Sequence, residues 1–175
     1  NEVSFVIPRN WRIIDQNTKT TLEASVASRI QIPVNTNLPF AANLYNHSNS
    51  TIGIINLRVY PEMNVSQIDV INANKDEIYF FDQELYKNIS KGVSLSGGKV
   101  IEWYGTKKVK INNKLYLLSK YKRQSAISKN KDFKVRLIRL LDGKNSFTLT
   151  LSYSDHAEHL LKPIIEKIQS SLKTY

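Results

Sequence analysis

Apolar and polar residues alternate, or form short apolar runs, along much of the chain, which is typical of β-strands. Val3–Pro8 is predicted as a first strand. Phe40–Asn46 and Thr51–Tyr60 are predicted as two strands joined by the polar turn His47–Ser50. Both faces of Thr51–Tyr60 are partly apolar, which indicates a central strand covered by helices on one side. Thr21–Ile30 fits either a short helix or a strand.

Two regions show the three- to four-residue apolar spacing of an amphipathic helix. In Ser66–Lys91, Ser66 and Asn74 are each followed three residues later by an acidic residue, which is the pattern of a capping box. The predicted buried stripe of this region is Ile78, Phe81, Leu85 and Ile89. Gly92 is predicted to end the helix.

The second helical region closes the chain. Asp155 and Glu158 are predicted to cap it, and Pro163 predicts either a kink or the start of its regular part. Its apolar stripe is Leu161, Ile164, Ile165, Ile168 and Leu172.

Strand patterns return between these helices, separated by residues that favour turns. The predicted strands are Lys99–Tyr104, Val109–Ile111, Leu115–Tyr121, Lys134–Leu141 and Ser146–Tyr153. Gly105 is expected to follow the end of the first strand. Asn112–Asn113 and Asp142–Gly143 are expected to form hairpin turns, because these residue types tolerate left-handed backbone geometry. Successive hairpins predict an antiparallel sheet.

The order of these elements resembles the PsbP-like family, which includes photosystem II PsbP proteins, Ran-binding Mog proteins and bacterial DcrB-type lipoproteins. FVIPRNW at Phe5–Trp11 is similar to the family's opening strand and Trp turn, and NNKLYLLSKY at Asn112–Tyr121 to its aromatic-rich strand. FTLTLSYS at Phe147–Ser154, leading to IIEKIQSSLK at Ile164–Lys173, is similar to its final strand and closing helix. The resemblance implies an α+β fold in which an antiparallel sheet is sandwiched by helices (α/β/α), with a non-catalytic binding or adaptor role.

The composition fits one domain over residues 1–175, because 175 residues with 41% hydrophobic content can bury a single core. The chain contains no cysteine, which excludes disulfides, thiolate metal sites and a cysteine nucleophile. We therefore expect a periplasmic or secreted protein, with a cytoplasmic location as the alternative.

Positive charge is concentrated in one stretch of the chain. The net charge is +10, and Lys99–Lys144 carries 14 Lys and Arg against 3 Asp and Glu. If the strands of this stretch are neighbours, their cationic side chains form one patch, which is a candidate footprint for an anionic partner. The predicted patch is Lys114, Lys120, Lys122, Lys134 and Arg136. The competing interpretation is a solvated surface that only keeps the protein soluble.

Catalytic and metal-binding patterns are sparse. His156 and His159 have the spacing at which two imidazoles could ligate a metal. The acidic residues beside them, Asp155 and Glu158, are also explained without a metal, because negative charge is favourable at the start of a helix. The glycine-rich run Gly92–Lys99 fails as a phosphate loop, because Val100 stands where Ser or Thr would hold magnesium. We expect no enzyme activity and no cofactor.

The sequence thus predicts a binding or adaptor protein of the bacterial envelope, which engages a protein partner through the sheet and the basic hairpins; an acidic partner is one option. The alternative is direct binding of an anionic polymer or a membrane surface. Nucleic acid is not expected, because the chain has no RNA-binding signature motif. The identity of the partner and the oligomeric state are left open.

Overall fold

The computed structural model describes residues 2–21, 37–60, 63–125 and 131–175. Its strands are β1 (Val3–Ser4), β2 (Arg12–Ile13), β3 (Asn37–Tyr45), β4 (Thr51–Val59), β5 (Lys99–Ile111), β6 (Lys114–Gln124), β7 (Asp132–Leu140), β8 (Phe147–Ser154) and β9 (Lys173–Thr174). Residues 16–21 at the end of the first described range are helical, and the helices described from end to end are α2 (Gln67–Asn72), α3 (Lys75–Leu95) and α4 (Glu158–Ser170), with short 3-10 turns at Gly143–Asn145 and Asp155–Ala157.

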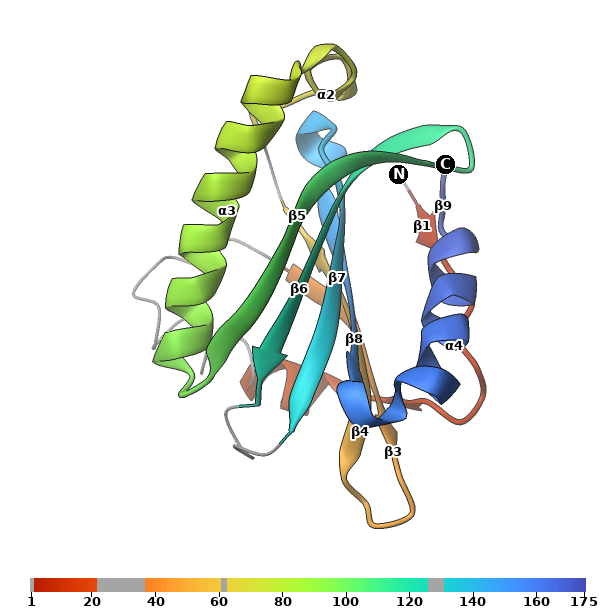
Figure 1. The fold of residues 1–175 in the computed structure, drawn as a ribbon. Coiled ribbons are helices and arrows are strands. Elements are labelled where there is room, and N and C mark those ends of the chain that lie inside the picture. The colour runs from red at the N-terminus through yellow and green to blue at the C-terminus, as the bar shows by residue number, and fades with distance from the viewer. Residues whose placement is uncertain (1, 22–36, 61–62, 126–130) are drawn as a thin grey trace.

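Seven of the strands form one antiparallel sheet in the order β2-β3-β4-β8-β7-β6-β5. The helices α2 and α3 cover one face of this sheet, and α4 covers the other (Figure 1). The two ends of the chain lie side by side, because β1 pairs with β9. The predicted α+β architecture, with an antiparallel sheet between helices, is confirmed.

The main core lies between the sheet and α4. Leu149 and Leu151 of β8 are fully buried there, against Ile165 and Ile168 of α4. Two smaller apolar clusters lie on the opposite face, under α2 and α3. Because β8 is a central strand, its apolar face has no access to water, and burying each Leu or Ile side chain stabilises the fold by about 1.5–3 kcal/mol.

The hairpin turns follow the backbone preferences of their residues. Asn112 and Asn113 have φ values of 45° and 69°, the left-handed geometry of a tight turn between β5 and β6. Asp142–Gly143 does not form a two-residue turn. Gly143 instead begins a 3-10 turn within a longer connection between β7 and β8.

Gly105 does not end a strand. The predicted strands Lys99–Tyr104 and Val109–Ile111 are one continuous strand, β5, which is irregular where the pairing register shifts between Trp103 and Gly105. Gly105 adopts a φ of 81°, so glycine accommodates a bulge here. The bulge lets the strand curve and continue.

The helix predicted at Ser66–Lys91 is two helices, each with one of the two predicted capping boxes. Ser66 caps α2 and Asn74 caps α3, and both boxes are complete. Gly92 does not end α3, which continues to Leu95 and is followed by Gly97 in left-handed geometry, with φ of 81°. A single glycine inside a helix costs only about 1 kcal/mol, which the packing of α3 offsets.

Two predictions concern the N-terminal part of the chain. Of the strand predicted at Val3–Pro8, only Val3–Ser4 pairs with another strand, β9. The segment predicted at Thr21–Ile30 lies, apart from Thr21 itself, outside the described residues.

The Trp turn packs closely on the sheet. The Trp11 ring is buried, and a Cβ at Gly53 of β4 would stand 2.6 Å from it. Glycine at this position therefore makes room for the indole ring.

Candidate functional site

The predicted basic patch lies on the face of the sheet that α4 covers. Lys120 of β6 is directly opposite Arg136 of β7, and Lys122 is directly opposite Lys134. Their strand neighbours on the same face, such as Leu118, pack into the core beneath α4. Lys114 begins β6 near the hairpin turn, away from the other four cations. The structure thus brings four of the five predicted residues together.

Two of these four cations are neutralised by carboxylates. Lys122 forms ion pairs with Asp155 at 2.7 Å and with Asp132 at 3.1 Å. Lys134 pairs with Asp155 at 3.1 Å and with Glu158. We call these five residues the ion-pair cluster. Because it contains two positive and three negative charges, it offers no excess positive charge to a partner.

Hydrogen bonding in the ion-pair cluster favours the charged forms of its members. The bond to Asp155 raises the pKa of Lys122, and the bond to Glu158 raises the pKa of Lys134. The same bonds lower the pKa of the Asp155 and Glu158 carboxyl groups. The prediction that Asp155 and Glu158 cap the last helix is wrong, because α4 begins after Ala157 without a side-chain cap. Their carboxylates bind lysines of the sheet instead.

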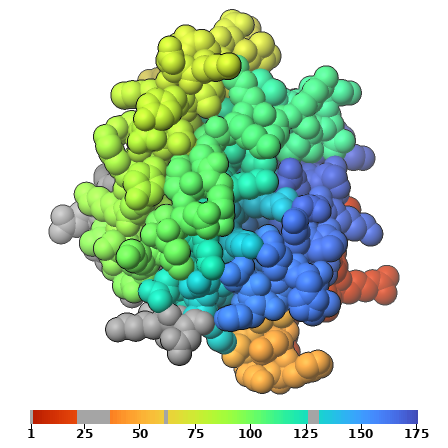
Figure 2. Space-filling view, viewed as in Figure 1, coloured from red at the N-terminus to blue at the C-terminus, as the bar shows by residue number. Residues whose placement is uncertain are grey.

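Next to the ion-pair cluster the sheet surface forms an open hollow of about 470 Å³. The strands β5 to β8 and the first turns of α4 line it. Figure 2 shows the surface of β6 and β7 between the green of β5 and the blue of α4. This volume is within the range of about 300–1,000 Å³ typical of ligand pockets.

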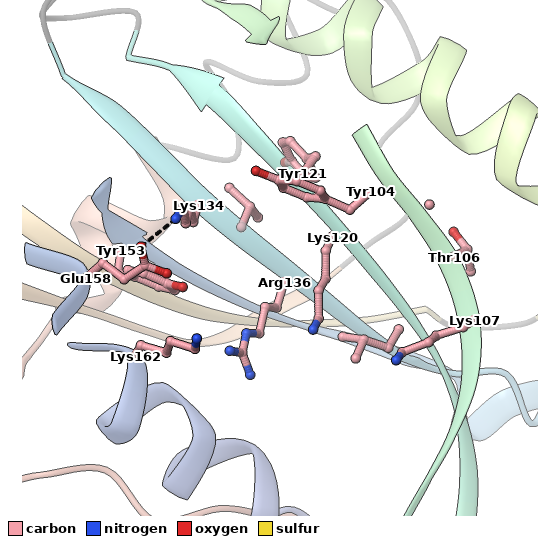
Figure 3. A pocket seen from close by; sticks show the side chains of 13 residues that line it. Tyr104, Thr106, Lys107, Lys120, Tyr121, Lys134, Arg136, Tyr153, Glu158 and Lys162 are labelled. Carbon is pink, nitrogen blue, oxygen red and sulfur yellow. Dashed lines mark hydrogen bonds and ion pairs between the residues drawn. The ribbon is translucent and has the colours of Figure 1, made fainter. Parts of the chain in front are cut away.

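Five cations line the hollow. Lys134 belongs to the ion-pair cluster, and the other four form a row with one member each from β5, β6, β7 and α4. These four are Lys107 of β5, Lys120 of β6, Arg136 of β7 and Lys162 of α4. Figure 3 shows their side-chain nitrogens one after another from α4 to β5. We call them the cationic row. Neighbouring strands are about 4.8 Å apart, so these like charges lie close together.

Only one carboxylate forms an ion pair with the cationic row among the described residues. Arg136 donates from Nη2 to Glu166 Oε1 at 3.1 Å, and from Nη1 to Gln169 Oε1 at 3.0 Å. Within the described part of the chain, Lys107, Lys120 and Lys162 form no ion pair. The row therefore has a positive charge that the described residues do not neutralise.

The unpaired state of Lys120 affects its protonation. Burial, followed by repulsion from Arg136 and Lys107, lowers the pKa of the Lys120 ammonium. A bound anion would reverse this effect by favouring the charged form.

Burial raises the pKa of Tyr153 at the same hollow, and a hydrogen bond to Glu102 raises that of Tyr104. The hollow therefore combines cations with tyrosines that keep their protons at neutral pH.

Sequence reasoning missed two members of the cationic row. Lys107 lies just beyond the bulge at Gly105, and the pairing of β5 with β6 could have placed it beside Leu118. Lys162 lies in a helix far along the chain, and only the packing of α4 on the sheet brings it to the hollow. No local pattern in the sequence indicates that contact.

The two histidines whose spacing could suit a metal, His156 and His159, lie on two different elements. His156 is in the 3-10 turn before α4 and His159 is in α4 itself. Within the described ranges, no three His, Asp or Glu side chains are grouped in a way that could hold a metal ion. Among the described helices, none is both long and apolar enough to cross a membrane.

Comparisons with known proteins bear on the fold. No model of a protein family matches the sequence, and no curated protein sequence does. Among solved structures, cyanobacterial PsbP (CyanoP) from Synechocystis sp. PCC 6803 superposes with a TM-score of 0.58 at 11% identity, covering 99% of this chain and 86% of the other.

Two further structures are more distant. A protein from Bacteroides thetaiotaomicron has a TM-score of 0.46 at 15% identity, and 99% of this chain matches 45% of it. LpqN of Mycobacterium tuberculosis, which is involved in cell envelope biogenesis, has a TM-score of 0.48 at 9% identity, over 98% of this chain and 82% of its own. The superposition on CyanoP, together with the order of the elements, shows that the chain has a PsbP-like fold.

Proposed function

We propose that the protein is a non-catalytic binding protein that engages an acidic protein partner through the hollow and its cationic row. The observation that carries the proposal is the contrast in pairing on one sheet face. Lys122 and Lys134 are paired with carboxylates, whereas Lys107, Lys120 and Lys162 have no ion-pair partner among the described residues. Clustered unpaired cations repel each other, so an anionic partner relieves a cost already present in the free protein.

The shape of the site supports a partner that inserts a side chain or a short segment. The floor is a sheet, and α4 forms one wall, so the backbone positions from which the cations extend are set before binding. A backbone that is already ordered loses little conformational entropy on binding, which favours affinity. The exposed Tyr104 adds aromatic surface of the kind enriched at protein interfaces.

A non-catalytic role is supported by the state of the carboxylate at the hollow. The hydrogen bond from Lys134 lowers the pKa of Glu158, which moves it further from neutral pH than that of an ordinary glutamate and suits it less to proton transfer there. We further propose that the protein works outside the cytoplasm, as the lack of cysteine suggested. Fractionation of the producing cells, followed by detection of the protein, tests this location.

The alternative is that an anionic polymer or a membrane surface, rather than a protein, occupies the cationic row. Both ligands would be attracted by the same charge, and both attractions would weaken at high salt. The two alternatives differ in what is recovered with the protein, so one experiment separates them.

The experiment compares charge reversal at the hollow with equal charge reversal elsewhere. The test variant carries Lys107→Glu, Lys120→Glu and Lys162→Glu. The control carries Lys75→Glu, Lys87→Glu and Lys91→Glu on the exposed surface of α3, on the opposite side of the sheet. Both have the same net charge. Each is immobilised, exposed to an extract of the source cells, and washed at low and at high salt.

We expect wild type and control to retain an acidic protein that the test variant does not retain. Equal retention by all three proteins would contradict the proposal. Binding of wild type to vesicles containing phosphatidylglycerol, or to an acidic polysaccharide, with no protein retained, would establish the alternative instead. Circular dichroism of each variant verifies that the fold is intact.

A further inference from the structure

The guanidinium of Arg136 already carries a carboxylate supplied by the chain itself. The Arg136 side chain is only 9% exposed, whereas that of Glu166 is 53% exposed. One guanidinium nitrogen binds Glu166 Oε1 and the other binds Gln169 Oε1. The two donor nitrogens of Arg136 therefore bind one oxygen from each of two side chains. A single carboxylate could accept hydrogen bonds from both nitrogens.

A single carboxylate is the better ligand for this group. The planar guanidinium matches the two oxygens of a carboxylate in a bidentate pair, which is stronger and more specific than two separate bonds. Glu166 makes a single hydrogen bond to Arg136 and lies half in water, so its release costs little.

Glu166 is not needed to attach α4 to the sheet. Leu161, Ile165 and Ile168 are buried beneath the helix. At the C-terminal end of the helix, Asn112 Nδ2 donates to the carbonyl oxygens of Ser170 and Leu172. The contact between Glu166 and Arg136 is therefore available for exchange.

Resting on the proposed function, we propose that a carboxylate of an acidic peptide segment replaces Glu166 and Gln169 on Arg136. Glu166 is then an internal competitor that weakens binding, and Arg136 is the residue that selects a carboxylate. Lys120 and Lys162 lie on either side of Arg136 in the row and attract the neighbouring negative charges of the same segment (Figure 3). Replacing an ordinary contact residue weakens binding. Under this proposal, replacing Glu166 strengthens it, because Glu166 competes with the peptide for Arg136.

The test uses a fluorescein-labelled peptide of six glutamates, with binding followed by fluorescence anisotropy at low ionic strength. Wild type is compared with Glu166→Gln, which keeps an amide oxygen to accept from Arg136 but removes the charge. The control is Glu84→Gln on α3, where an exposed glutamate pairs with Lys87. Both substitutions raise the net charge equally, so only the place of the change differs.

We expect Glu166→Gln to bind the peptide about threefold to tenfold more tightly than wild type, and Glu84→Gln to bind like wild type. Equal tightening by both variants would show a general charge effect and would overturn the inference. So would unchanged or weaker binding by Glu166→Gln, or no peptide binding by any of the proteins. The proposed function has its own test, which is whether the variant with Lys107→Glu, Lys120→Glu and Lys162→Glu still retains the acidic protein. Urea unfolding of Glu166→Gln verifies that the gain does not come from a disturbed fold.

Discussion

The ion-pair cluster and the cationic row lie side by side on one sheet face, yet their charges are in opposite situations. In the ion-pair cluster, Asp155 alone binds two lysines, and Lys122 and Lys134 each contact two carboxylates. In the cationic row, one half-exposed glutamate contacts one of four cations among the described residues. The comparison separates two situations of positive charge: one group of cations holds the start of α4, and the other is the group to which we assign the proposed ligand.

The difference arises from a single turn of helix. Asp155 and Glu158 stand at the beginning of α4, above Lys122 and Lys134. One turn later the helix presents Lys162 to the hollow, above Arg136 and Lys120. The same helix thus neutralises Lys122 and Lys134, whereas it brings to Lys120 and Arg136 both a further cation, Lys162, and one carboxylate, Glu166. A count of charges along the chain cannot distinguish the pair Lys122 and Lys134 from the pair Lys120 and Arg136.

The largest expected effect is on stability, from Asp155→Asn. This change leaves Lys122 and Lys134, both partly buried, without their shared carboxylate. We expect the free energy of unfolding to fall by about 2 kcal/mol, because charge-assisted hydrogen bonds of partly buried groups are lost. Urea unfolding measures this fall. Glu84→Gln, which breaks an exposed ion pair, should change stability by less than about 0.5 kcal/mol. Equal effects would remove the distinction between the cluster and an ordinary surface pair.

A smaller effect is expected from acid. The folded state lowers the pKa of Asp155 and of Glu158, so their contribution to stability is complete above the unfolded pKa values, about 4. It is lost as pH falls through the lower folded values. Urea unfolding at several pH values between 7 and 3 should therefore show stability declining below about pH 5. The decline should be shallower in Asp155→Asn, and an identical pH profile in wild type and variant would contradict this role.

The sequence predicted the fold well because local signals agreed with one another. Ser66 and Asn74 begin helices where capping boxes predict them, and Asn112–Asn113 forms the tight turn its residues favour. The main errors concern where elements stop. Gly92 and Gly105 were expected to interrupt a helix and a strand, but tertiary contacts of α3 and pairing with β6 carry both elements past them.

The site was predicted only in part, because charge pairing depends on packing between distant segments. Alternation along β6 and β7 placed Lys120 and Arg136 on a common face, and the structure sets them opposite each other. The role of Lys122 could not be inferred, since its partner Asp155 follows β8 and was expected to cap a helix. Lys162 was missed for the same reason. Sequence patterns show which residues share a face but not which helix covers it.

The most direct test of the central claim exchanges one lysine from each region. Lys120→Gln and Lys122→Gln remove the same charge from the same strand and the same sheet face. Affinity for the hexaglutamate peptide and free energy of unfolding are measured for both. We expect Lys120→Gln to weaken peptide binding by about fivefold or more without lowering the stability, because the charge that it removes is disfavoured by burial and repulsion. Lys122→Gln should instead lower stability and leave affinity within about twofold. Loss of affinity in Lys122→Gln with retention in Lys120→Gln would contradict the account.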